Sequence, residues 1–250
     1  MKQSLILWSS ALFLTFISGY IRSGISEYYP VTGTIGIDEK KVSYRFEKKF
    51  NDKGNYTFII RTDTPDIEAV VKWKQDTEKD WKVIEMTNEQ TALTADIPRL
   101  DAGGTILYFA EIIKDNKKYI VPDKPVALLF QGSVPGMISF LGSFALFGGL
   151  LFSFRTGLEF FNENQKIKKL TLFTAVFFFV YTIAVTPLRK SYELNAINKT
   201  VVPITSLFDT QSILILLTWI AAMVVVFKLK NPKPAVMFFA VFTTLVFLFT

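Results

Sequence analysis

Long runs without any charged residue constrain this chain more than any other feature of its sequence. Backbone N–H and C=O groups cannot bond water inside a bilayer, so a run of about 20 apolar residues crosses it as a helix. Such runs cover 4–21, 136–154, 170–187, 210–227 and 235–250, and the last is the shortest. We therefore predict an α-helical transmembrane domain over 132–250, with about four helices.

The first apolar run, between Lys2 and Arg22, has two interpretations that stay open. Small residues at Gly24 and Ser26 have the spacing of a signal-peptide cleavage site. The run is also long for a signal peptide and close to the length of a span, which favours an uncleaved anchor. In both cases residues 1–26 direct the following segment out of the cytoplasm.

The residue types that are missing exclude several classes of chemistry. The 250 residues include no cysteine and no histidine, which excludes disulfides, thiol catalysis, zinc–thiolate sites and histidine general bases. The formal net charge is +6. No basic residues cluster into a face for nucleic acid, and in a membrane protein such an excess usually lies in cytoplasmic loops. We expect no enzyme, no cofactor and no metal site.

Between residues 27 and 131 the apolar side chains repeat every second residue. This period places alternate side chains on one face of a strand, and polar clusters between the runs mark turns. Several short strands of this kind predict an antiparallel β-sandwich. The predicted core-facing residues are Val42, Tyr44, Phe46, Tyr56, Phe58, Ile60, Ile67, Ala69, Val71, Trp73, Thr91, Leu93, Ala95, Ile97, Ile106, Tyr108, Ala110 and Ile112.

Residues 67–129 carry a recognisable order of short motifs. The order runs "AVVKWKQ", "WKVIEM", "TALTADIP", "AGGTILYFAEI" and "KDNKKYIVP", and its marker residues are Trp81, Val83, Met86, Ile97, Pro98, Gly103, Tyr108, Asp115 and Pro122. This order resembles the immunoglobulin-like or fibronectin-III-like modules of exported bacterial proteins. The resemblance implies the fold and says little about function, because such modules serve many activities. The spacing before Tyr108 departs from that of a tyrosine corner.

The charged loops predict which side of the membrane each domain occupies. Arg155, Lys166, Lys168 and Lys169 follow the first internal run, and Lys228, Lys230 and Lys233 follow the third. The positive-inside rule places both groups in the cytoplasm. The chain is therefore predicted to be a multi-pass protein of the cytoplasmic (inner) membrane, with its β-domain on the extracytoplasmic side.

The loop predicted over 186–210 contains cations on the side that this rule disfavours. Arg189 and Lys190 are simplest to explain as side chains that reach lipid headgroups. The alternative is a contact site in which they, with Tyr192, dock the β-domain or an acidic partner. Asp209 precedes a helical run and is predicted to cap it. In the β-domain, Trp81 is the tryptophan predicted to be exposed and joins this candidate contact site.

A stripe of small residues marks the first internal span. Gly142, Ala145 and Gly149 recur every three or four residues, which lets another helix approach closely. Packing within the bundle is the favoured use, and a homo-oligomer interface is the alternative. None of the apolar runs contains an ionisable residue, which argues against coupled transport. Carboxylates at Asp63, Asp66, Glu68, Asp76, Glu78, Asp80 and Glu85 alternate with lysines and are interpreted as a solvated surface.

These patterns together predict a mixed fold, an immunoglobulin-like β-sandwich plus a transmembrane helix bundle. The predicted function is binding or assembly within a bacterial cell envelope. The predicted partners are membrane lipids and another envelope protein. The alternative is an accessory or structural subunit of a membrane transport complex.

Overall fold

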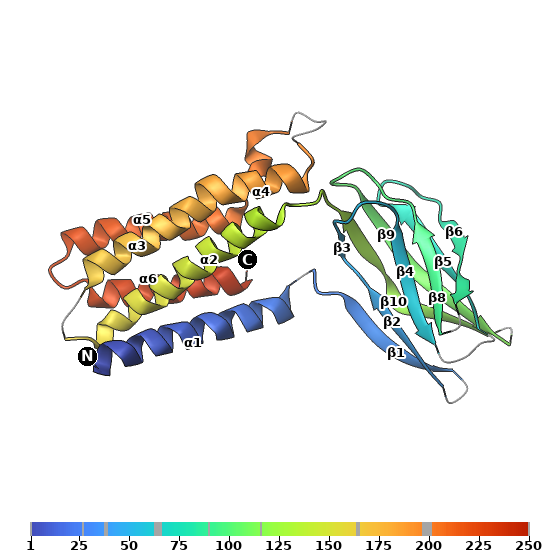
Figure 1. Cartoon of the computed structure of the whole chain (residues 1–250), viewed down its shortest axis with the longest axis horizontal. Helices are drawn as coiled ribbons and strands as arrows, with labels where there is room; N and C mark the ends of the chain where they lie inside the picture. The colour runs from blue at the N-terminus through green and yellow to red at the C-terminus, as the bar shows by residue number, and fades with distance from the viewer. Residues whose placement is uncertain are drawn as a thin grey trace. The chain divides into compact units, whose positions relative to one another are not determined.

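The computed structural model separates the chain into two compact units (Figure 1). The helical unit comprises Met1–Ser26, Val134–Tyr192 and Ala196–Thr250, and the β-unit comprises Glu27–Ser133 and Glu193–Asn195. The structure describes residues 2–26, 28–37, 40–62, 67–89, 91–115, 117–163, 166–196 and 202–249. The predicted surface carboxylates Asp63 and Asp66 lie outside these residues.

The β-unit contains two five-stranded sheets. The first has the order β1 (Val31–Ile37), β2 (Lys40–Phe46), β4 (Tyr56–Thr62), β8 (Ala92–Ile97) and β7 (Thr87–Glu89). The second has the order β3 (Lys49–Phe50), β10 (Lys117–Phe130), β9 (Thr105–Lys114), β5 (Glu68–Gln75) and β6 (Lys82–Glu85). All pairings are antiparallel except that of β3 with β10, so the second sheet is mixed.

Both sheets contribute to one hydrophobic core, as the alternating pattern predicts. On β4, the side chains of Tyr56, Phe58 and Ile60 are buried and the intervening ones are exposed. Trp73 on β5 is 6% exposed and belongs to the same core. The alternation is therefore confirmed for these strands, because a side chain on the inner face of either sheet has no access to water.

Tyr108 on β9 is fully buried in this core and contacts β4 and the connection between β2 and β3. Its hydroxyl donates to the backbone carbonyl of Glu47 at 2.8 Å and lies 3.3 Å from the hydroxyl of Tyr56. Burial raises the pKa of both tyrosines, because an ionised phenolate would lose its hydration there. The bonded carbonyl lies 61 residues upstream, in the connection between β2 and β3, so this long-range bond differs from a tyrosine corner.

The helical unit contains α1 (Lys2–Ile25), α2 (Gly136–Gly157), α3 (Ile167–Phe179), α4 (Thr186–Glu193), α5 (Thr210–Lys228) and α6 (Lys233–Phe249). Short 3₁₀ segments cover η1 (Leu158–Phe161) and η3 (Ile204–Leu207), and a π-helical segment covers η2 (Val180–Val185). Within the described residues, four helical stretches are long and apolar enough to cross a membrane: Gln3–Ile25, Gly136–Phe161, Ile167–Glu193 and Thr210–Lys228. The last apolar run forms the shorter helix α6.

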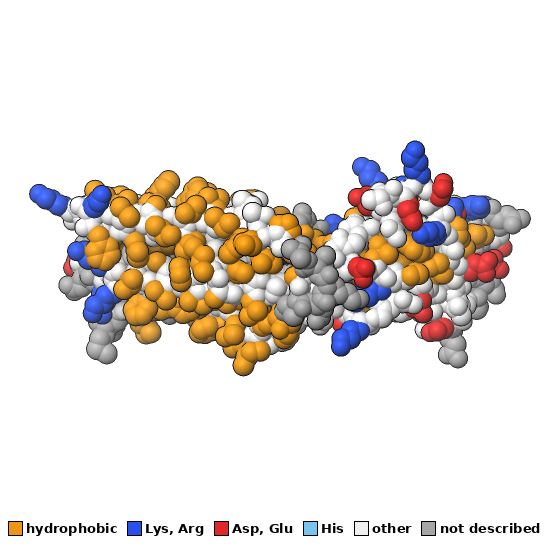
Figure 2. All heavy atoms as spheres, turned by 90° about the horizontal axis from the view of Figure 1, so that it is seen from above, with side chains coloured by type: hydrophobic (Ala, Val, Ile, Leu, Met, Phe, Trp, Pro, Cys, Tyr) orange, Lys and Arg blue, Asp and Glu red, His pale blue; other side chains and the backbone are white. Residues whose placement is uncertain are grey.

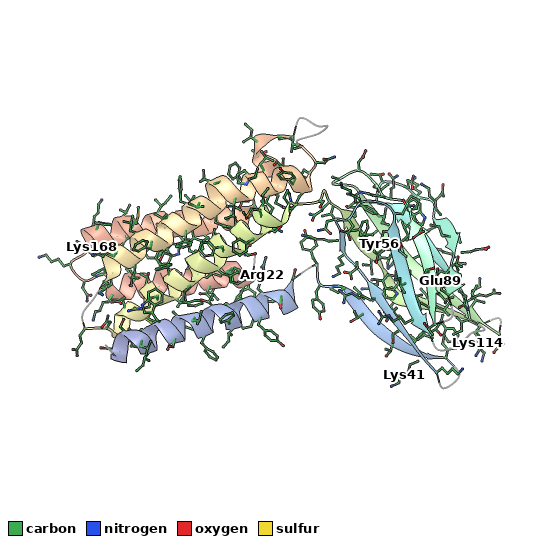
Figure 3. All side chains as sticks on the ribbon, in the orientation of Figure 1. Arg22, Lys41, Tyr56, Glu89, Lys114 and Lys168 are labelled. Atoms are coloured by element: carbon green, nitrogen blue, oxygen red, sulfur yellow. The ribbon has the colours of Figure 1, made fainter. Side chains whose placement is uncertain are left out.

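The connections with the predicted cytoplasmic lysines lie at one end of the helical unit. The α2–α3 and α5–α6 connections are both at this end, where Ile167, Val226 and Val236 form a buried cluster (Figure 1). Lys168 lies at this end and Arg22 at the opposite one (Figure 3). The bundle therefore brings together two basic segments that are about 60 residues apart in the sequence.

The small-residue stripe on α2 lies inside the bundle. Gly142, Ala145 and Gly149 are buried. A Cβ atom placed at Gly149 would lie 2.7 Å from the ring of Phe178 on α3, and one at Gly142 would lie 3.3 Å from Val185. The close approach thus occurs between helices of one chain. A second copy would have to displace α3 to reach the same residues.

The first part of the segment predicted as a loop over 186–210 is helical, because α4 covers Thr186–Glu193. That part of the prediction is wrong. α3, η2 and α4 form one helical stretch, and Pro187 lies inside it. Proline lacks an N–H and its ring crowds the preceding turn, and the wider π-helical turns just before it relieve that crowding. The hydroxyl of Thr186 donates to the carbonyl of Tyr181 at 2.9 Å. Arg189, Lys190 and Tyr192 are consequently carried on α4.

Candidate functional site

The outer face of the second β-sheet is unusually apolar. Along β9, the sequence "TILYFAEIIK" places apolar residues on both faces, so Leu107, Phe109 and Ile113 point away from the core and are half-buried. An antiparallel sheet with one face on a core usually presents polar residues on the other. We name this surface the Trp81 face and define it by Val70, Lys72, Lys74, Trp81, Val83, Leu107, Phe109, Glu111 and Ile113.

Two aromatic rings form the first element of the Trp81 face. The rings of Trp81 and Phe109 meet edge to face, with centroids 4.8 Å apart. The ammonium group of Lys74 lies 5.1 Å from the Trp81 centroid, within the range of a cation–π contact. Trp81 is half-exposed, whereas Trp73 is buried, as strand parity predicts. These contacts hold the half-exposed indole in one orientation.

An ion pair lies beside the aromatic pair. The Nζ atom of Lys72 is 2.5 Å from an Oε atom of Glu111. The Glu111 side chain is only 11% exposed, because apolar neighbours on β5 and β9 surround it. The Lys72 side chain is 30% exposed, so the pair is only partly desolvated.

The apolar surface continues onto the neighbouring strands. Val83 on β6 is 56% exposed and pairs with Lys72, and Ile120 on β10 is 55% exposed and pairs with Glu111. Figure 2 shows hydrophobic side chains gathered among charged ones on the visible face of the β-unit. Residues on four adjacent strands therefore form one surface. The sequence predicts only Trp81 as an exposed residue and does not predict that surface.

A second polar cluster is buried in the helical unit. Arg155 is 2% exposed and Glu159 is fully buried, and Nη1 of Arg155 lies 2.5 Å from Oε1 of Glu159. The guanidinium carbon also lies 5.5 Å from the ring centroid of Trp8 on α1. The prediction that Arg155 lies in a loop is wrong, because the helix continues past it. Both residues belong to the stretch Gly136–Phe161, so a candidate span does contain ionisable groups.

The carboxylate of Glu159 organises the turn between α2 and α3. One oxygen accepts from the backbone N–H of Lys166 at 3.0 Å, and both accept from the side-chain amide of Asn162 at 3.0 and 3.2 Å. With Arg155, four short contacts surround the two oxygens. A carboxylate with all its acceptor positions occupied is suited to holding a turn in place rather than to carrying protons.

Polar groups at the opposite end of the bundle satisfy helix termini. The carboxylate of Asp209 accepts from the N–H of Ser212 at 2.6 Å, which confirms the predicted N-cap of α5. The amide of Gln211 donates to two carbonyls in the last turn of α6, and Arg22 donates to the carbonyl of Leu248 at 3.3 Å. These side chains replace the hydrogen bonds that the end of α6 lacks.

The three predicted contact residues on α4 differ in their exposure. Arg189 is exposed, and Lys190 and Tyr192 are half-buried. All three belong to the helical unit, whereas Trp81 belongs to the β-unit. Their role in docking the β-domain or a partner stays a prediction.

The predicted surface carboxylates within the described residues are solvated: Glu68, Asp76, Asp80 and Glu85 are exposed and Glu78 is half-buried. Glu78 forms an exposed ion pair with Lys82 at 2.9 Å, and this hydrogen bond lowers the pKa of the Glu78 carboxyl. Among the described residues, no group of three or more acidic side chains could hold a metal ion.

Comparisons with known proteins do not place the chain in a family. No family model matches it, and no curated protein matches it. A solved structure described as "Crystal structure of Br derivative BhCBM56" aligns with 42% of this chain and 95% of its own, at 13% identity. The TM-score of 0.26 is too low to support an argument about fold or function.

Proposed function

We propose that this protein is a membrane-anchored component of a bacterial cell envelope, whose β-unit binds another envelope protein through the Trp81 face. The observation that carries the proposal is the apolar outer face of a sheet whose inner face already packs on the core. Exposed apolar patches that enclose an aromatic anchor are characteristic of protein-binding surfaces. The Trp81–Phe109 pair is the anchor, and the Lys72–Glu111 pair gives the contact its orientation.

The helical unit supports the role of an anchor. Four of its helical stretches are long and apolar enough to span a bilayer, and hydrophobic side chains cover its visible side (Figure 2). Lys and Arg gather at the end that contains the α2–α3 and α5–α6 connections. We place this end in the cytoplasm and the β-unit outside the inner membrane, on the positive-inside rule.

The finer fold assignment is also part of the proposal. Two β-sheets on a shared core, with Trp73 buried in β5, support an immunoglobulin-like module.

The proposed orientation in the membrane can be tested by external protease on sealed cells. Cleavage near the exposed Lys79 with protection near Lys168 is expected, and cleavage near Lys168 would reverse the proposed orientation.

One observation favours the alternative of a subunit in a membrane complex. A groove of about 500 Å³ between α2 and the α3–η2 stretch is lined almost entirely by apolar side chains, including Leu141, Phe144 and Val180. A lipid acyl chain or a helix of a second membrane protein fits this chemistry. In this alternative the helical unit, and not the Trp81 face, makes the main contact.

Site-specific photocross-linking in native membranes tests the proposal. A photoreactive amino acid at Val83 is expected to join one envelope protein, and Trp81→Ala on the same chain is expected to abolish that product. Ile59 is the matched control position, because it is apolar and 45% exposed on β4 of the other sheet. Equal products from Val83 and Ile59, or a product that persists in Trp81→Ala, would contradict the proposal. Products only from Phe144 would favour the membrane-complex alternative.

A further inference from the structure

The edges of the two sheets are protected to very different degrees. An unprotected edge exposes backbone donors and acceptors, and natural proteins protect edges with charge, proline or short length. β7 has three residues and β6 has four, and both carry charged side chains. Leu129 and Phe130 of β10 pair with β3. The rest of β10 is protected by lysines and prolines: Lys117, Lys118, Pro122, Lys124 and Pro125.

The remaining edge strand, β1, has none of these protections. Its seven residues read "VTGTIGI", without charge or proline. β1 pairs with β2 along its whole length, from Val31 opposite Phe46 to Ile37 opposite Lys40. Within the described part of the chain, no backbone hydrogen bond is made from its other side. A strand of this length with a free edge is a ready template for an added strand.

A groove lies beside the first residue of this edge strand, Val31. It has a volume of about 770 Å³ and lies between β1–β2 and the middle of β10. Tyr28 and Tyr44 line it on one side, and Pro125, Ala127 and Leu129 line it on the other. A strand added to β1 would direct the inward side chains that lie beside Val31 into this groove, because side chains alternate across a strand.

We propose that β1 binds an extended, largely uncharged segment of a second envelope protein, which adds to the first sheet as its sixth strand. Lys48, Lys124 and Asp123 also line the groove, so its lining has an excess of one positive charge and favours an acidic residue beside the apolar ones. A second copy of this chain is a poorer occupant. Its own Val31 and Ile35 already pack against its own core and cannot fill the groove of another copy.

This site is separate from the Trp81 face, so the two proposals can fail independently. The probe is a displayed library of random ten-residue peptides, selected on the full chain in lipid nanodiscs. Enriched peptides are expected to show alternating apolar residues and an acidic residue. Their binding is expected to be less than twofold weaker to the Val83→Asp variant, which alters only the Trp81 face.

Two proline variants then test whether the backbone edge is the binding element. In an antiparallel ladder, adjacent residues direct their N–H groups to opposite sides, so Thr34→Pro and Ile35→Pro remove one outward and one inward donor. The variant that keeps the wild-type melting temperature has lost the outward donor, and its peptide affinity is expected to fall at least tenfold. Unchanged affinity in that variant would overturn the proposal.

The cysteine-free sequence permits a mapping experiment that does not depend on proline. Thr32→Cys on β1 is expected to form a disulfide with a cysteine-bearing version of the selected peptide, and Thr57→Cys on central strand β4 is not. Peptides that cross-link equally to both positions would overturn strand addition. If the Thr32→Cys chain forms a disulfide-linked homodimer, and added peptide does not reduce its amount, then the occupant is a second copy of this chain. That result would overturn the proposed partner.

Discussion

The buried ion pair between Arg155 and Glu159 should show strong thermodynamic coupling. At the separation of 2.5 Å, an effective dielectric constant of about 20 gives an attraction of roughly 7 kcal/mol. Desolvation of each ion costs several kcal/mol, so the net contribution of the intact pair is small. Removal of one partner leaves the other charge buried and unpaired, and about 3–5 kcal/mol is then lost.

Two variants that each remove one charge, and their combination, measure this coupling. Arg155→Met keeps an unbranched side chain but removes the guanidinium group, and Glu159→Gln keeps an acceptor for the N–H of Lys166. Each single variant should lower the melting temperature by roughly 6–20 °C, at 2–4 °C per kcal/mol for a chain of this size. The double variant should return to within about 1–2 kcal/mol of the wild type, since neither charge is then left unpaired.

The assay is thermal unfolding of the full chain in one detergent, followed by circular dichroism at 222 nm. Arg45 and Glu47 provide a matched control, because they form a pair of the same residue types at 2.6 Å with the Arg45 side chain 64% exposed. The corresponding Arg45→Met and Glu47→Gln variants should change stability by about 0–1 kcal/mol. If the Arg155 and Glu159 effects simply add in the double variant, or if both singles resemble the exposed control, then the pair is hydrated and the reasoning is refuted.

Three further predictions concern the β-unit and α4. Trp73→Ala should destabilise the β-unit by about 3–5 kcal/mol, whereas Trp81→Ala should cost only its ring contact, about 0.5–1.5 kcal/mol. Denaturant unfolding followed by circular dichroism at 218 nm measures both losses. Equal losses would contradict the assigned faces. The pKa of Tyr108 is raised in the folded protein, so above the unfolded-state pKa of about 10 the unfolded chain ionises first. The stability that this tyrosine contributes is therefore fully present below about pH 10 and is lost as the pH rises above it. Tyr108→Phe should reduce this loss of stability between about pH 9 and 11. If Arg189 and Lys190 only reach lipid headgroups, replacing both by Gln should leave the cross-links from α4 to the β-unit or a partner unchanged. If the two cations dock, the same replacement should reduce these cross-links, and high salt should have the same effect.

The alternation of side chains and the charge-free runs were sufficient to identify both kinds of element from the sequence. A strand parity such as that of Phe58 and Ile60 is local, so it predicts burial without knowledge of the partner strand. The cap at Asp209 is equally local, because one side chain and three following residues determine it. Trp81 was identifiable as the more exposed tryptophan for the same reason.

Tertiary structure decided which of these residues belong together. The apolar run on β9 signals that both faces are apolar, but only strand pairing places Phe109 against Trp81 and Lys72 near Glu111. Likewise, a charge normally ends an apolar run, so the sequence predicts a loop at Arg155. Its burial depends on Glu159 one turn later and on Trp8 from another helix. Local pattern fixes the environment a side chain prefers, whereas long-range packing decides which partner makes a buried charge or an exposed ring stable.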